Sequence, residues 1–211
     1  MNAAEVSAAY LDALLERNSY HARRVVEEAL DGGMPVSEVY LGVLQPALYE
    51  LGRRWADGTV NVAFEHYGSA VTERLLGVLA ERLRTPPAGG RLAVVACTPD
   101  ELHALGARMV ADFLESDGWE VVHLGATTPP DDLAALAADE GADVVVLSTA
   151  MVERADGARA AVRALAALDP RPLIVIGGQA WRECEPPDEA DLVVRGDADE
   201  LVAALRDKFA S

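Results

Sequence analysis

The sequence has very little cysteine. Its two cysteines, Cys97 and Cys184, are far apart among 211 residues, and Cys97 lies inside the apolar run RLAVVACT. A thiol in such a run usually packs as a small hydrophobic side chain. A disulfide framework needs several paired cysteines, and a cysteine metal site needs closely spaced ones. We therefore expect neither in this chain.

Positive charge is also scarce, and lysine especially so. The chain has 18 basic and 35 acidic side chains, a formal net charge of −17, and Lys208 as its single lysine. Proteins that bind nucleic acid rely on Lys and Arg to neutralise phosphates. Direct nucleic-acid binding is therefore disfavoured. A role in gene regulation would have to act through a protein partner, such as a transcription regulator.

Long hydrophobic runs are missing as well. No apolar stretch approaches the roughly 18–20 residues that a membrane-spanning helix needs. The N-terminal segment MNAAEVSAAYLDALLERN has no basic leader before an apolar run, so it is not typical of a signal peptide. Hydrophobic residues still make up 51% of the chain, ample for a buried core. The sequence predicts a soluble, cytoplasmic protein without a membrane segment.

Residues 1–84 have apolar side chains at helical spacing throughout. Four helical segments with short connections are predicted, at 3–17, 19–33, 36–58 and 62–84. Pro46 is expected to kink or divide the third segment, because proline cannot donate the helical hydrogen bond. An antiparallel four-helix bundle follows from this pattern. The segment TPPAGG at 85–90 is typical of a linker between domains.

Residues 91–211 have a different sequence pattern. Helical segments alternate with short β-branched runs, which lie within 91–98, 119–125, 142–150, 172–178 and 190–196. Nearly continuous apolar strands that alternate with helices favour a parallel sheet covered on both faces. The prediction is an α/β domain with a flavodoxin-like or Rossmann-like, doubly wound, five-stranded parallel sheet.

Ligands of such open sheets bind beyond the carboxyl ends of the strands. The first strand is followed by PDELHALG, without a dinucleotide fingerprint or a phosphate-binding loop. A carboxylate two residues before a histidine can fix one ring nitrogen and increase the basicity of the other. Each of these features alone also fits a helix cap or a turn. The expected cofactor-binding residues at the strand ends are Thr98, Glu101, His103, Gly106, Ser148, Gly177, Gly178 and Gln179.

Taken together, E-x-H-x-x-G at 101–106, the serine after the third strand and Gly-Gly at 177–178 resemble the cobalamin-binding domain family. The resemblance implies that His103 binds cobalt from below in place of the cofactor's dimethylbenzimidazole tail, with Glu101 as its partner. Ser148 and the two glycines would line the channel of that tail. The segment STAM departs from the family pattern, because Ala150 stands where leucine is usual. Trp181, in the loop after the glycines, is a candidate for bordering the ligand or a partner.

The segment RRWADGTVNVAFEHYG at 53–68 has a tryptophan, nine residues and then Glu-His. Alone, it is typical of a core tryptophan and a solvated polar pair. In this order with the other motif, it resembles the signature of CarH-type adenosylcobalamin photoreceptors, which implies that Trp55, Glu65 and His66 hold the adenosyl group. Ala56 stands where those proteins usually have histidine. A MerR-type DNA-binding domain does not precede the bundle, so we expect a sensor module on its own or a piece of a longer chain.

The resemblance implies a non-enzymatic, adenosylcobalamin-dependent light sensor. Cleavage of the cobalt–carbon bond would shift the helical cap and change self-association or binding to a protein partner. A different class of function is a corrinoid methyl carrier that serves a cobalamin-dependent methyltransferase system. Such carriers resemble this chain in length and layout, but typically have Asp in place of Glu101 and lack the Trp/Glu-His arrangement.

Overall fold

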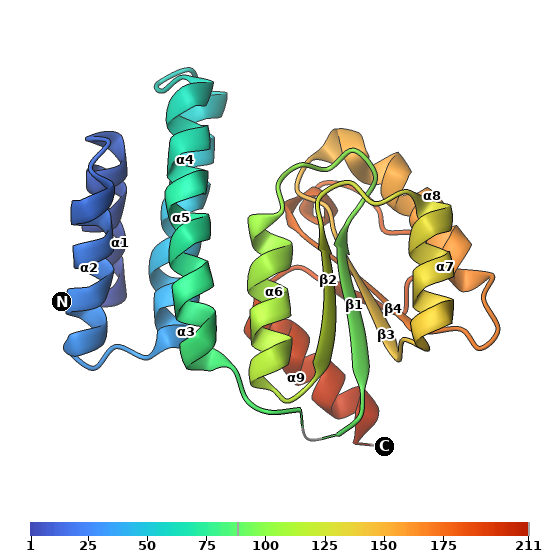
Figure 1. The fold of residues 1–211 in the computed structure, drawn as a ribbon. Helices are drawn as coiled ribbons and strands as arrows, with labels where there is room; N and C mark the ends of the chain where they lie inside the picture. The colour runs from blue at the N-terminus through green and yellow to red at the C-terminus, as the bar shows by residue number, and fades with distance from the viewer. Residues whose placement is uncertain (88, 211) are drawn as a thin grey trace. The chain divides into compact units, whose positions relative to one another are not determined.

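The computed structural model describes residues 1–87 and 89–210. They form two compact units, Met1–Leu83 and Arg84–Ser211 (Figure 1). The first unit is helical, and the second contains a parallel sheet with helices on both faces. Within these residues, no helix is both long enough and apolar enough to cross a membrane.

Four helical stretches build the first unit. They are α1 (Ala3–Leu15), α2 (Ser19–Asp31), the composite of α3 (Val36–Glu38), η1 (Val39–Leu44) and α4 (Gln45–Ala56), and α5 (Val62–Leu83). Asn2 begins α1 with a capping box, in which its side chain accepts from the Glu5 N–H while the Glu5 carboxylate accepts from the Asn2 N–H, both at 3.0 Å. The expected four-helix arrangement is confirmed.

The composite third helix changes its geometry just ahead of Pro46. Proline has no N–H to donate to the carbonyl of Gly42, and η1 is a π-helical segment that ends at Leu44. The carbonyl of Val43, within η1, accepts a buried hydrogen bond of 2.9 Å from the Ser7 hydroxyl on α1. The predicted effect of the proline is therefore seen as a π-helical segment that another helix supports.

The bundle core combines close helix approach with one buried polar pair. The hydroxyls of Tyr10 and Thr72 are 2.9 Å apart, and burial raises the pKa of Tyr10 to about 12 although the Thr72 hydrogen bond opposes that shift. A Cβ on Gly68 would lie 2.3 Å from Leu51 Cδ2, so the buried Leu51 side chain of α4 packs directly against the backbone of α5 at this glycine. The buried stripe of α5 contains Val71, Leu75 and Leu79.

The second unit contains five parallel strands in the order β2-β1-β3-β4-β5. The strands are β1 (Leu92–Cys97), β2 (Glu120–Gly125), β3 (Val144–Ser148), β4 (Leu173–Gly177) and β5 (Leu192–Val194). The helical elements are α6 (Leu105–Ser116), α7 (Pro130–Glu140), η2 (Val152–Arg154), α8 (Ala155–Ala166), η3 (Gln179–Arg182) and α9 (Ala198–Phe209). Figure 1 shows α7 and α8 on one face of the sheet and α6 and α9 on the other.

This topology brings the carboxyl ends of β1 and β3 to the point where the strand order reverses. The central strands are apolar and fully buried, as at Val94, Val145 and Ile174, because helices cover both faces. The strand order reverses between β1 and β3, since β2 lies on one side of β1 and the later strands on the other. The predicted doubly wound α/β fold is confirmed.

Candidate functional site

Parallel pairing brings three of the predicted residues side by side at the carboxyl edge of the sheet. Cys97 pairs with Ser148, and Ser148 pairs with Gly177. Thr98 follows Cys97, and its N–H donates to the carbonyl oxygen of Ser148 at 3.1 Å. These strand ends flank the point where strand order reverses, the usual ligand-binding position in open α/β sheets.

Glu101 is the centre of the loop that follows β1. Only 1% of this residue is exposed, and one carboxylate oxygen accepts from the backbone N–H groups of Ala150 and Met151, each at 2.9 Å. Its other oxygen accepts from the N–H of His103 at 2.9 Å and lies 2.6 Å from Nδ1 of the same residue. One buried carboxylate therefore joins the β1 loop to the β3 loop and orients the imidazole of His103.

The electrostatics of Glu101 follow from these four contacts. Burial alone would raise the pKa of this carboxyl, but the hydrogen bonds from His103 and Met151 outweigh burial and lower the pKa to about 2. Glu101 is therefore an anion at neutral pH, and Nδ1 of His103 is the nitrogen that donates to it. Nε2 is the other ring nitrogen and the one that a metal ion would bind, and 44% of the His103 side chain is exposed.

The predicted glycines occupy different environments. Gly106 lies in the first turn of α6, and a Cβ there would be 3.8 Å from the Ser148 hydroxyl oxygen. Gly178 has φ 105°, and a Cβ on it would lie 2.2 Å from the carbonyl oxygen of Thr149. Gly178 is thus required by the backbone itself. Gly177 ends β4, and Gln179, which begins η3, is exposed.

Two hydroxyls at the same edge are buried without a hydrogen-bond partner among the described residues. They belong to Thr98 and Thr149, each 0% exposed, at the ends of β1 and β3. A buried hydroxyl without a partner is costly, and such atoms occur where a ligand or water completes the site. The edge therefore combines a single oriented imidazole with hydroxyls able to bond to a polar ligand.

Several residues of this edge were not identified from the sequence. Thr149 could have been found, because it occupies the same strand-end position as Thr98. The contributions of Ala150 and Met151 are backbone N–H groups, which leave no side-chain signal. The expectation for Trp181 was wrong, since η3 folds it into the core of the sheet unit with 1% exposure.

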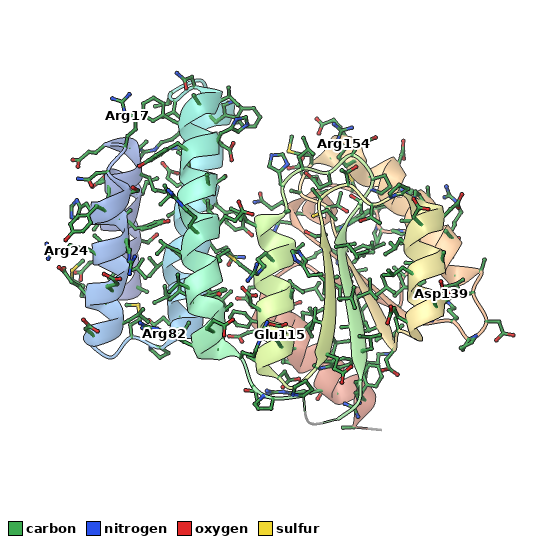
Figure 2. The ribbon with its side chains drawn as sticks, in the orientation of Figure 1. Arg17, Arg24, Arg82, Glu115, Asp139 and Arg154 are labelled. Carbon is green, nitrogen blue, oxygen red and sulfur yellow. The ribbon has the colours of Figure 1, made fainter. Side chains whose placement is uncertain are left out.

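The other predicted group lies on the helical unit, where α4 ends and α5 begins. Trp55 lies in the last turn of α4 and is 37% exposed. Glu65, in the first turn of α5, accepts from the Ser69 hydroxyl at 2.7 Å, and Nε2 of the exposed His66 is 3.7 Å from its second oxygen. Arg17 lies over the ring of Phe64, 5.4 Å from the centroid, at the same end of the bundle (Figure 2). Trp55 on one side of the α4–α5 connection and Glu65 with His66 on the other are thus all partly or fully exposed.

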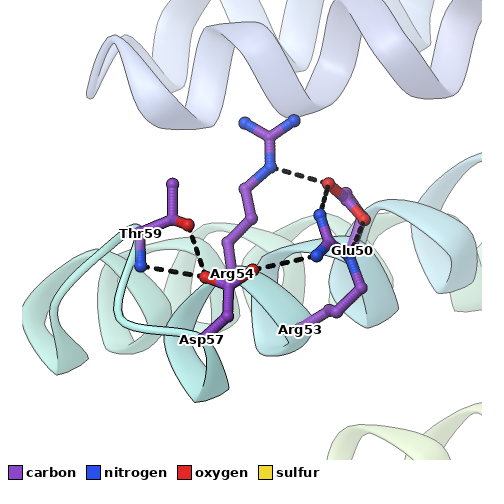
Figure 3. Close-up of polar contacts among 5 residues, drawn as sticks. All are labelled: Glu50, Arg53, Arg54, Asp57 and Thr59. Carbon is purple, nitrogen blue, oxygen red and sulfur yellow. Dashed lines mark hydrogen bonds and ion pairs between the residues drawn. The ribbon is translucent and has the colours of Figure 1, made fainter.

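A charged network holds the last turn of α4, which carries Trp55. Figure 3 shows Glu50 between two arginines, with Arg53 donating to both carboxylate oxygens at 2.8 Å and Arg54 donating to one at 2.7 Å. Arg53 also donates to Asp57 at 2.9 Å, and Asp57 accepts from the N–H and hydroxyl of Thr59. Hydrogen bonds from Arg53 and Arg54 lower the pKa of Glu50 to about 2. These contacts therefore link the last two turns of α4 to the start of the α4–α5 connection.

Comparison with known proteins bears on both units. Residues 91–206 and residues 6–80 each match a family described as "B12 binding domain". The chain is 34% identical over 160 residues to the HTH-type transcriptional repressor CarH of Myxococcus xanthus, covering 75% of this chain and 52% of that protein. It therefore spans about half the length of that curated relative.

Corrinoid proteins are similar over more of their length. The dimethylamine corrinoid protein of Methanosarcina barkeri is 25% identical over 193 residues, which cover 87% of this chain and 89% of that protein. The solved structure of the monomethylamine corrinoid protein of M. barkeri has a TM-score of 0.83 at 20% identity, covering 97% of this chain and 98% of that one. At that identity the structural likeness establishes the fold.

Proposed function

Because the chain belongs to the B12-binding domain family, with cobalamin as its cofactor, we propose that it is an adenosylcobalamin-dependent light sensor. The observation that carries this proposal is the Glu101–His103 pair at the strand-order reversal. When bound, adenosylcobalamin would supply a cobalt–carbon bond that light cleaves. His103 is the residue that would bind the cobalt of this cofactor.

The residues at the sheet edge fit this cofactor. Across the described residues, no three His, Cys, Asp or Glu side chains gather into a metal site. A single imidazole is nevertheless a sufficient donor set for a metal whose other ligands come from its own macrocycle. Glu101 fixes the tautomer that leaves Nε2 as the metal-binding nitrogen. Thr98, Ser148 and Thr149 would bond to polar groups of the cofactor, and Gly106 leaves space beside Ser148.

On the helical unit, Trp55, Glu65 and His66 are proposed to hold the adenosyl group. An exposed indole offers a flat apolar face, and Glu65 can accept hydrogen bonds from ribose hydroxyls. The Glu50 network lies in the same part of α4 as Trp55, and by limiting the motion of this turn it would lower the entropic cost of binding. Loss of the adenosyl group would remove what these three residues contact and release the helical unit to rearrange.

The proposed output is a change in self-association or in binding to a protein partner. CarH is described as a transcriptional repressor, and the similarity supports a role in transcription regulation for this chain. The net charge of −17 favours a partner protein over direct contact with nucleic acid. The chain would act as a binding and sensory protein in this scheme, without a reaction of its own.

A corrinoid methyl carrier is the second candidate. It is favoured by the similarity to the dimethylamine corrinoid protein, which extends over 89% of that protein. The sequence differs from the carrier pattern in having Glu101 before His103 and in having Trp55 with Glu65 and His66. We therefore rank the carrier second.

One experiment separates the two functions. The purified protein is loaded with adenosylcobalamin or methylcobalamin, and its visible spectrum and size-exclusion elution are recorded in darkness and after green illumination. The sensor predicts preference for the adenosyl form and altered elution after light. Preference for methylcobalamin with unchanged elution would support the carrier and contradict the sensor.

Substitutions test the proposed roles of His103 at the sheet edge and of Trp55 and Glu65 at the α4–α5 connection. His103→Ala should remove the histidine-bound, base-off spectrum, whereas His21→Ala, at an exposed histidine on α2, should leave it intact. Trp55→Ala and Glu65→Gln should reduce discrimination between the two cobalamins while corrin binding survives. Tyr49→Ala is the matched control, because Tyr49 is an aromatic residue of α4 that is 41% exposed.

A further inference from the structure

Thr127 joins the loop after β2 to the loop that carries Glu101 and His103. Its hydroxyl oxygen accepts from the N–H of Asp100 at 3.0 Å, and its own N–H donates to the carbonyl oxygen of Glu101 at 3.1 Å. These two bonds fix consecutive residues at the start of the His103 loop. The loop is therefore held from the β2 side by Thr127 and from the β3 side through the Glu101 carboxylate.

Both residues of this contact have a left-handed backbone. Asp100 has φ 61° and Thr127 has φ 46°. This conformation is uncommon for any side chain other than glycine, and for a β-branched residue it is an outlier. Glycine would adopt it without strain but would lack the hydroxyl that receives the Asp100 N–H. Threonine is strained at this position, but its hydroxyl oxygen supplies the acceptor for the Asp100 N–H.

We propose that Thr127 is a positioning residue for His103, a role that rests on the proposed cobalamin site. The geometry is a short chain of contacts, in which Thr127 holds Asp100 and the Glu101 backbone and Glu101 holds the imidazole. Thr127 is exposed, so it acts without being part of the core. Loss of its hydroxyl frees the start of the loop, and the Glu101 carboxylate then has to orient His103 on a looser backbone.

The test uses three substitutions at one position. Thr127→Val removes the hydroxyl and keeps the β-branched shape, Thr127→Gly removes the hydroxyl and relieves the strain, and Thr127→Ser keeps the hydroxyl. Amide hydrogen exchange of the cofactor-free protein is measured at Asp100 and His103. In the valine and glycine variants we expect about tenfold faster exchange at Asp100, whose amide loses its acceptor, and faster exchange at His103, whose loop is less restrained; the serine variant should exchange at near wild-type rates. Thr85→Val, at an exposed threonine before β1, is the control.

A second measurement reports on the imidazole itself. Titration with adenosylcobalamin should give about tenfold weaker binding and a smaller histidine-bound fraction in the valine and glycine variants, with recovery in the serine variant. Unchanged exchange at both amides in Thr127→Val would overturn the proposal, as would a serine variant that behaves like valine. If the wild-type protein takes up no adenosylcobalamin, the proposed function fails, and the exchange rates still decide whether Thr127 positions the loop.

Discussion

Glu101→Gln is the change that most directly tests how the His103 loop is held. The carboxylate accepts from four donors, namely two groups of His103 and the backbone N–H groups of Ala150 and Met151. Glutamine offers one oxygen and one NH₂ group. If the NH₂ faces Ala150 and Met151, two buried donors lose their acceptor. If it faces His103, one backbone donor loses its acceptor, and the imidazole must reverse its tautomer so that Nδ1 accepts.

The expected loss of stability follows from the number of buried donors that Glu101→Gln leaves without an acceptor. Each buried donor without an acceptor costs about 1–3 kcal/mol, and one or two donors lose theirs, so we expect the substitution to lower the free energy of unfolding of the sheet unit by about 1–6 kcal/mol. The pKa of Glu101 agrees with this in direction, because its lowering from 4.5 to about 2 means that folding favours the charged carboxylate. This stabilisation is complete above pH 4.5 and is lost as the pH falls toward 2, since the folded state holds the carboxylate in its charged form.

Hydrogen exchange of the β1 and β3 amides under denaturant measures the stability of the sheet unit separately from the bundle. Nitrogen NMR of the imidazole reports the tautomer of His103. Glu153→Gln, at an exposed carboxylate on η2, makes the same chemical change outside the site and should leave stability within about 0.5 kcal/mol of wild type. A Glu101→Gln protein as stable as this control, with an unchanged tautomer, would refute the reasoning.

Three further changes test other parts of the structure. Gly178→Ala should destabilise the sheet unit by at least about 3 kcal/mol, because of its φ of 105° and a backbone clash, whereas Gly77→Ala should stabilise α5 by about 0.5–1 kcal/mol; thermal unfolding measures both, and a benign Gly178→Ala would contradict the geometry. Cys97 should resist alkylation in the native protein at pH 8 while Cys184 reacts, since burial and then the nearby carboxylate raise the pKa of Cys97 to about 12; peptide mapping that finds equal labelling would contradict this. Trp55→Phe should retain more adenosyl preference than Trp55→Ala in competitive titrations, and equal loss in both would argue against aromatic contact.

The fold was predictable because its pattern is strongly periodic. Apolar runs such as the one ending at Cys97 alternate with helices, and this alone indicated a doubly wound parallel sheet. The effect of Pro46 was also predictable, since the missing N–H is a local property. The form of that effect, a π-helical segment that ends at Leu44, was not, because it depends on the packing of a neighbouring helix and on the hydroxyl of Ser7.

The candidate site was predictable only where side chains carry it. The spacing of Glu101 and His103 indicated the carboxylate–imidazole pair, which the structure forms at 2.6 Å. The hydrogen bonds between Thr127 and the His103 loop depend on a left-handed backbone that threonine rarely adopts. Residue propensities therefore do not indicate these bonds. The prediction for Trp181 was wrong because the sequence of this short loop segment does not indicate that the tryptophan folds back into the core. The roles of Trp55 and Glu65 stay predictions.

The imidazole of His103 is proposed to bind cobalt. Electron paramagnetic resonance of protein-bound cob(II)alamin reads the axial nitrogen directly, because ¹⁴N and ¹⁵N nuclei split the cobalt lines differently. Protein labelled with ¹⁵N only in histidine should convert the triplet splitting to a doublet, and His103→Ala should abolish that conversion. A triplet that persists in the labelled wild-type protein would mean that cobalt keeps the cofactor's own base, and it would contradict the account.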